Sequence, residues 1–129
     1  MIGYNWLSKD LVLALHGEQL AEHGGPDGIS DMKSLESTLD HPKDMFTDEG
    51  CSDPAVLAAA YAFEIVKNRP FVDGKKRMAF LSAEMFLELN GYQLTASDKE
   101  CVITVLGLSD GTLTEEELIQ WFQANVKTA

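Results

Sequence analysis

Apolar and polar positions follow one another along the chain with the period of amphipathic helices, and residues that favour helix ends interrupt the pattern. A serine can cap a helix over residues 9–24, which stops at a glycine pair. After a turn rich in Gly, Ser30 or Asp31 opens a short helix over 31–40. Residues 41–52 show no apolar period, so we predict a loop there.

Two strongly apolar segments follow this loop. Asp53-Pro54 pairs a helix-capping residue with a proline suited to the first helical position, ahead of an Ala-rich helix over 55–68. A second apolar helix is predicted over 76–90, where a glycine stops it. Because both helices are apolar on most faces, we expect them to lie in the centre of the protein.

Helices are also predicted in the last third of the chain. Ser97 with Glu100, and Thr114 with Glu117, have the spacing of capping boxes, which open helices. No convincing alternating run of β-branched residues occurs, so sheet content should be small. The predicted fold class is all-α: a single domain over residues 1–129, built as a bundle of about six helices with two buried central ones.

Composition and charge narrow the possible functions. Apolar residues make up 45% and charged residues 24% of the chain, which is typical of a globular rather than a disordered protein. A formal net charge of -11 disfavours general affinity for nucleic acid or anionic membranes. No apolar run is long enough to span a membrane, and we see no secretory signal, so a cytoplasmic location is expected. Cys51 and Cys101 are isolated, which favours reduced thiols over a zinc site.

Positive charge is concentrated in residues 68–77, NRPFVDGKKR, between the two apolar helices. This stretch holds four of the ten Lys and Arg residues, including both arginines. The start of the second apolar helix would be formed by Gly74, Lys75, Lys76 and Arg77. Helix N-termini with flanking cations bind phosphate, and Asp73 beside them could hold Mg²⁺. The same residues also fit a plainer interpretation, a solvated loop in which Asp73 only caps the helix.

The loop resembles the signature of the Fic/Doc family, His-x-Phe-x-Asp/Asn-Gly/Ala-Asn-Lys/Arg-Arg. The resemblance covers essentially the whole chain. The segment LALHGEQLAEHGGPDGISDMKSLESTLDHP is similar to the N-terminal part of Doc-type (death-on-curing) toxins, and AAAYAFEIVKNRPFVDGKKRMAFLSAEMFLELNGYQL is similar to their core. The family is helical, in agreement with the fold class predicted from the residues.

The resemblance implies an activity and partners. Members of the family move a phosphoryl group or a nucleoside monophosphate from a nucleotide to a hydroxyl side chain of a target protein. The Doc branch resembles a kinase of translation elongation factor Tu and works as the toxin of a toxin–antitoxin pair. The implied cofactors are ATP, or another nucleotide, and Mg²⁺. The implied partners are a cognate antitoxin, whose segment folds into a helix in an apolar groove of the toxin, and the elongation factor, with no nucleic acid and no membrane.

Site residues are carried over by position in the motif. Phe71 matches the core-anchoring Phe and Asp73 the acidic Mg²⁺ position. The phosphate-binding turn is matched by Gly74, Lys76 and Arg77. Two positions depart from the motif: Arg69 stands in place of the catalytic His, and Lys75 in place of Asn.

The departures predict an impaired enzyme. The family His is a general base, whereas the guanidinium of Arg69 carries only donors and stays protonated. General base catalysis is worth about 10²–10⁴ in rate, and we expect at least that loss. Lys75 changes the charge around the metal, and Arg69 could pair with Asp73 and take its carboxylate from the metal. The changes fit a natural inactive member or a gene recovered only in inactivated form.

Three functional readings stay open at this point: a Doc-like phosphotransferase toxin, with protein adenylylation as its close variant; a non-catalytic module that binds nucleotide or antitoxin; and a structural protein. His41 could lie near the site, but we expect a solvated loop histidine rather than a replacement base. Trp6 and Trp121 are expected to serve in packing.

Overall fold

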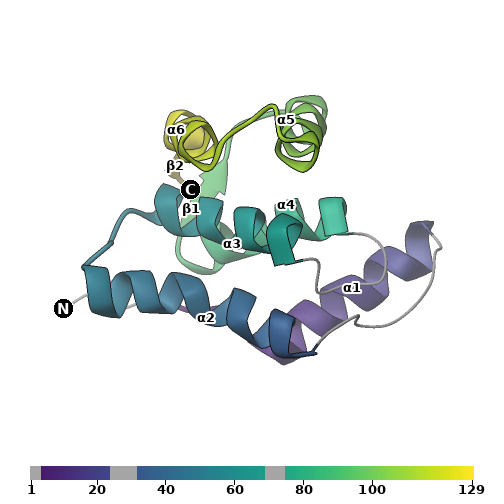
Figure 1. The fold of residues 1–129 in the computed structure, drawn as a ribbon, viewed down its shortest axis with the longest axis horizontal. Coiled ribbons are helices and arrows are strands. Elements are labelled where there is room, and N and C mark those ends of the chain that lie inside the picture. Colours follow the sequence, from purple (N-terminus) through teal and green to yellow (C-terminus); the bar gives the residue numbers. More distant parts are fainter. Residues whose placement is uncertain (1–3, 24–31, 69–74) are drawn as a thin grey trace.

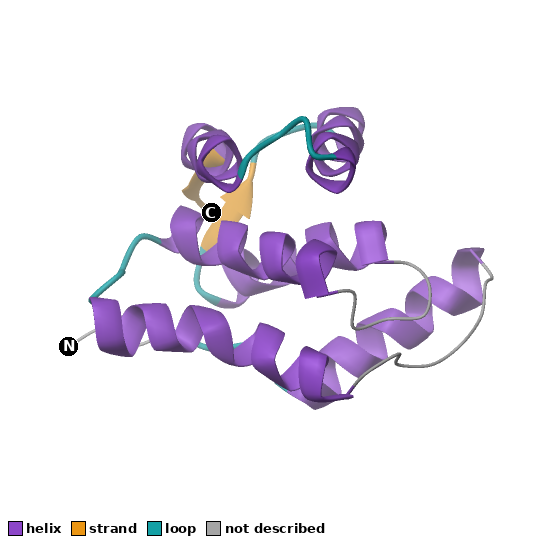
Figure 2. Cartoon of the chain, in the orientation of Figure 1, coloured by secondary structure: helices purple, strands orange, loops and turns teal. Residues whose placement is uncertain are grey.

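Helices make up most of the computed structural model, which describes residues 4–23, 32–68 and 75–129 (Figures 1 and 2). The helices in these ranges are α1 (Lys9–His23), α2 (Met32–Glu49), α3 (Pro54–Asn68), α4 (Lys75–Leu89), α5 (Asp98–Asp110) and α6 (Glu115–Asn125). The strands are β1 (Tyr92–Leu94) and β2 (Val126–Thr128), which pair antiparallel. The prediction of an all-α fold with about six helices and little sheet is confirmed for the described part of the chain.

The central layer consists of α3 and α4, as the sequence predicted. In Figure 1, α1 and α2 cover one side of this pair, and α5 and α6 cover the other. Tyr61 and Ile65 of α3, and Met78 and Phe86 of α4, are fully buried. Burying a large apolar side chain contributes about 1.5–3 kcal/mol, so these two helices supply much of the stabilising burial. Their buried alanines leave the two backbones free to approach closely.

Helix ends follow the local sequence closely. The Ser8 hydroxyl accepts the Leu11 N–H at 3.1 Å and caps α1. An Asp53 carboxylate oxygen accepts the Ala55 N–H at 2.9 Å at the start of α3. Both predicted capping boxes, at the starts of α5 and α6, are present. Gly91 follows the end of α4 with a φ of 85°, a left-handed conformation that favours glycine. These predictions are confirmed because each cap depends on residues within one turn.

The second helix is longer than the sequence predicted. The loop expected over 41–52 is wrong for its first nine residues, because α2 continues to Glu49. Pro42 lies inside the helix, where it removes one backbone hydrogen bond. Packing compensates for that loss: Pro42 is buried, and Phe46 packs with Tyr4 and Trp6 at ring distances of 5.6 Å. The predicted start of α2, at Ser30 or Asp31, lies outside the described residues.

An aromatic cluster joins the N-terminal segment to the central helices. The Phe86 ring lies 5.6 Å from Tyr4, 5.7 Å from Trp6 and 5.2 Å from Tyr61. The Leu7 N–H donates to the Tyr61 hydroxyl at 3.2 Å, so this buried oxygen is paired. The packing role expected for Trp6 is confirmed.

The other tryptophan, Trp121, packs on the opposite side of the central layer. Its ring lies 6.3 Å from Phe80 and 5.1 Å from Phe122. Through these contacts the partly buried Trp121 of α6 packs against the buried Phe80 of α4. The packing role expected for Trp121 is confirmed as well.

Burial of Tyr61 predicts a pH dependence of stability. Desolvation raises the pKa of its hydroxyl from 10.0 to about 12. Because the neutral phenol is favoured in the folded protein, its contribution is complete below about pH 10 and is lost as the pH rises to about 12. We expect the free energy of unfolding to fall by on the order of 2 kcal/mol across this range. Chemical denaturation would show a smaller fall for Tyr61→Phe; equal falls in both proteins would contradict the prediction.

Candidate active site at the junction of α3 and α4

The predicted site residues belong to the segment that connects α3 to α4. Arg69, Phe71, Asp73 and Gly74 lie outside the described residues, and their predicted roles stay predictions. The two elements that flank them are described, so the site is located by the ends of two buried helices.

The positive side of the site is the first turn of α4. This helix begins at Lys75, so residues 75–77 form its first turn, and the predicted helix start is confirmed for the backbone. That turn carries no acidic residue. Its first N–H groups have no partner within the helix, and the helix dipole places partial positive charge there. With three cationic residues and no carboxylate in its first turn, this terminus carries the kind of charge that favours an anion.

Buried side chains hold both flanks of the connecting segment. Ile65 and Val66 are buried just before it in α3, and Met78 and Ala79 are buried just after it in α4. The last turn of α3 and the start of α4 are therefore fixed by packing against the core. A rigid support of this kind is what a binding or catalytic site requires.

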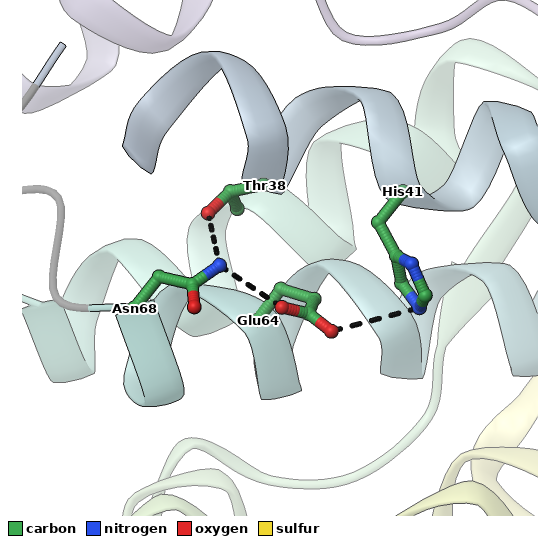
Figure 3. Close-up of polar contacts among 4 residues, drawn as sticks. All are labelled: Thr38, His41, Glu64 and Asn68. Carbon is green, nitrogen blue, oxygen red and sulfur yellow. Dashed lines mark hydrogen bonds and ion pairs between the residues drawn. The ribbon is translucent and has the colours of Figure 1, made fainter. Parts of the chain in front are cut away.

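A polar cluster that sequence reasoning missed lies beside the end of α3 (Figure 3). Asn68, the last residue of α3, donates from its side-chain nitrogen to the Thr38 hydroxyl at 3.0 Å and to a Glu64 carboxylate oxygen at 2.9 Å. Thr38 is fully buried, and Glu64 is 8% exposed. The signal in the sequence was Glu64 itself, the one acidic residue of a mostly apolar helix, one turn before the end of that helix.

His41 belongs to this cluster and not to a solvated loop. It lies in α2, and its Nε2 is 3.5 Å from a carboxylate oxygen of Glu64. The loop placement was wrong because α2 continues past Pro42. The His41 side chain is 42% exposed, so it contacts a buried carboxylate while remaining accessible to solvent.

Metal ligands and reactive thiols do not gather elsewhere in the described ranges. Within residues 4–23, 32–68 and 75–129, no group of three or more His, Cys, Asp or Glu side chains could hold a metal ion. Both Cys51 and Cys101 are free thiols. Burial raises the pKa of the Cys101 thiol to about 11, which disfavours the nucleophilic thiolate.

Across the parts of the chain that the structure describes, no helix has both the length and the apolar character required to cross a bilayer.

Comparison with known proteins identifies the family of the chain. The sequence model of the Fic/DOC family matches residues 6–87, well over half of the 129-residue chain, and the match includes the α3–α4 junction. The chain is also similar to the protein named "Protein kinase doc" of Escherichia phage P1, with 29% identity over 108 residues, which cover 84% of this chain and 85% of the phage protein. The resemblance seen in the motif is thereby confirmed, and the chain belongs to the Fic/DOC family.

Proposed function

We propose that this protein is a Doc-like toxin of a toxin–antitoxin module that works in the cytoplasm. Its site would transfer a phosphoryl group from ATP to a hydroxyl of a translation factor, elongation factor Tu. The observation that carries the proposal is the similarity to the phage P1 kinase over most of both chains. The cationic, acid-free first turn of α4 supports it from the physical side.

The nucleotide would be held mainly by the start of α4. Lys76 and Arg77 match the phosphate-binding positions of the family motif, and backbone N–H groups of the same turn add donors. In a chain of net charge -11, an anion needs such local compensation. Asp73 would hold Mg²⁺, since this ion prefers one or two carboxylates together with phosphate oxygens. When bound, the nucleotide with its metal supplies the phosphoryl group.

Arg69 and Lys75 would leave the enzyme impaired. The hydroxyl that attacks the nucleotide must lose its proton, and the motif His is the group that accepts it. Arg69 offers no lone pair for this proton at any working pH. Lys75 adds a positive charge where the family has a neutral amide. Substrate positioning and charge stabilisation would remain, so we expect weak rather than absent transfer.

A second candidate is a non-catalytic module that still binds nucleotide or antitoxin. Arg69 favours it, because an added cation strengthens attraction for phosphate while removing the base. Adenylylation of the target is a variant of the first candidate, in which the nucleotide binds in the opposite orientation. In either candidate the expected partner is a cognate antitoxin.

Calorimetry with ATP and Mg²⁺ tests the part that both candidates share. We expect saturable binding to the unaltered chain and at least about tenfold weaker binding after Lys76→Ala or Arg77→Ala, since charge-assisted contacts to phosphate are lost. Lys127→Ala, in the exposed strand β2, is the matched control for the loss of one cation. No binding heat, or equal weakening by the control, would contradict the proposal.

A further inference from the structure

We propose that Asn68 is a positioning residue: held by Thr38 and Glu64, it fixes the end of α3 at which the motif segment begins. The inference rests on the proposed function, because it assigns that segment a reaction to be positioned for. It concerns residues outside the family motif, contributed by α2 and α3 (Figure 3).

Each hydrogen of the Asn68 side-chain amide has its own acceptor in the cluster. A side-chain amide nitrogen carries two hydrogens, and Asn68 has one acceptor for each, Thr38 at 3.0 Å and Glu64 at 2.9 Å. Both acceptors are buried in packed helices, so neither can follow Asn68 if it moves. The amide is therefore fixed from two helices at once.

Glu64 is held in turn by His41. The two carboxylate oxygens have different partners: one accepts from Asn68, and the other lies 3.5 Å from His41 Nε2. A buried carboxylate is costly without partners, and a hydrogen bond to an ionised group is stronger than a neutral one. With one carboxylate oxygen beside His41, the oxygen that accepts from Asn68 stays directed at the end of α3.

The cluster lies at the end of α3, immediately before the motif segment, and this position indicates its role. The last turn of a helix has carbonyl groups without intrahelical partners and frays readily. Asn68 lies in that turn and immediately precedes Arg69, the residue at the motif His position. Tying Asn68 to α2 suppresses fraying at the residue from which the motif starts. A misplacement of about 1 Å at a reacting group can cost about 10²-fold in rate.

The test uses Thr38→Val, because Thr38 is 30 positions away from Asn68 in the sequence. Valine keeps the size of the side chain but removes the acceptor. We expect faster amide hydrogen exchange in the last turn of α3, residues 65–68, and Thr38→Ser, which restores the hydroxyl, should return most of the protection. Asn68→Ala should give the same change as Thr38→Val. Asn125→Ala is the matched control: Asn125 ends α6, its amide donates to the Trp121 carbonyl at 2.8 Å, and its loss should leave exchange in residues 65–68 unchanged.

A kinetic measurement separates positioning from general stability. In the background of Arg69→His with Lys75→Asn, Thr38→Val should lower kcat on the order of 100-fold. KM for ATP should change little, since the phosphate contacts lie on α4. Unchanged exchange of residues 65–68 in both Thr38→Val and Asn68→Ala would overturn the proposal, as would equal effects of Thr38→Val and Thr38→Ser. Absence of transfer in the background itself would refute the proposed function instead, and the exchange data would still decide the role of Asn68.

Discussion

Replacing Arg69 with His and Lys75 with Asn is expected to raise phosphoryl transfer by at least about 10²-fold, and by up to about 10⁴-fold. The reason is the proton of the attacking hydroxyl. A histidine with a pKa near neutrality can accept that proton, whereas a guanidinium cannot. Asn at position 75 also removes a positive charge from the neighbourhood of Asp73. Transfer of label from ATP to purified elongation factor Tu measures the gain directly.

The controls assign the gain to the site. Arg69→His alone should recover most of the rate, because it restores the base, and Lys75→Asn alone should recover little. Adding Asp73→Asn to the double variant should abolish the gain, since the proposed metal carboxylate is lost. Induction of the double variant in cells without antitoxin should arrest growth, and induction of the unaltered chain should not. Equal turnover of the unaltered chain and the double variant would show that Arg69 and Lys75 do not limit the enzyme.

Phe86→Ala is expected to lower the free energy of unfolding by about 3–5 kcal/mol. The Phe86 side chain is fully buried on α4, and three aromatic rings surround it at 5.2–5.7 Å. Removing it leaves a cavity that Tyr4, Trp6 and Tyr61 cannot fill without losing their own contacts. A domain of this size has a total stability of about 5–15 kcal/mol, so this loss would be a large fraction of the total.

Urea denaturation followed by circular dichroism measures this loss. Leu89→Ala is the matched control, because Leu89 lies on the same helix and is 40% exposed. Because Leu89 keeps much more of its surface in solvent than Phe86 does, its truncation should cost clearly less than that of Phe86. Similar losses for the two variants would mean that Phe86 is not the packing centre that its burial indicates.

Local sequence predicted most helix boundaries. The caps at Ser97 and Thr114 and the stop at Gly91 each involve side chains and backbone groups within one turn. Such interactions depend little on the rest of the fold, so residue type and spacing are sufficient to find them. The C-terminal half of α2 was missed for the opposite reason. Its stabilising contacts join Phe46 to Tyr4 and Trp6, which are about 40 residues away along the chain.

The candidate site also has a part that the sequence revealed and a part that it did not. The motif, with its cations and its two departures at positions 69 and 75, is a contiguous stretch and was visible in the sequence. The cluster of Thr38, Glu64 and Asn68 was not, because its members come from two helices and acquire meaning only when these pack. The predicted roles of Asp73 and Gly74 stay predictions.

The sequence by itself determined the helical fold class, most of the caps that start and end the helices, and the family to which the motif belongs, because each of these depends on neighbours in the chain. Only the tertiary structure decided that α2 continues through Pro42, that His41 faces a buried carboxylate, and that Asn68 is held from two helices. These features depend on contacts between residues far apart in the chain, whose entropic cost is met only when the whole core packs at once.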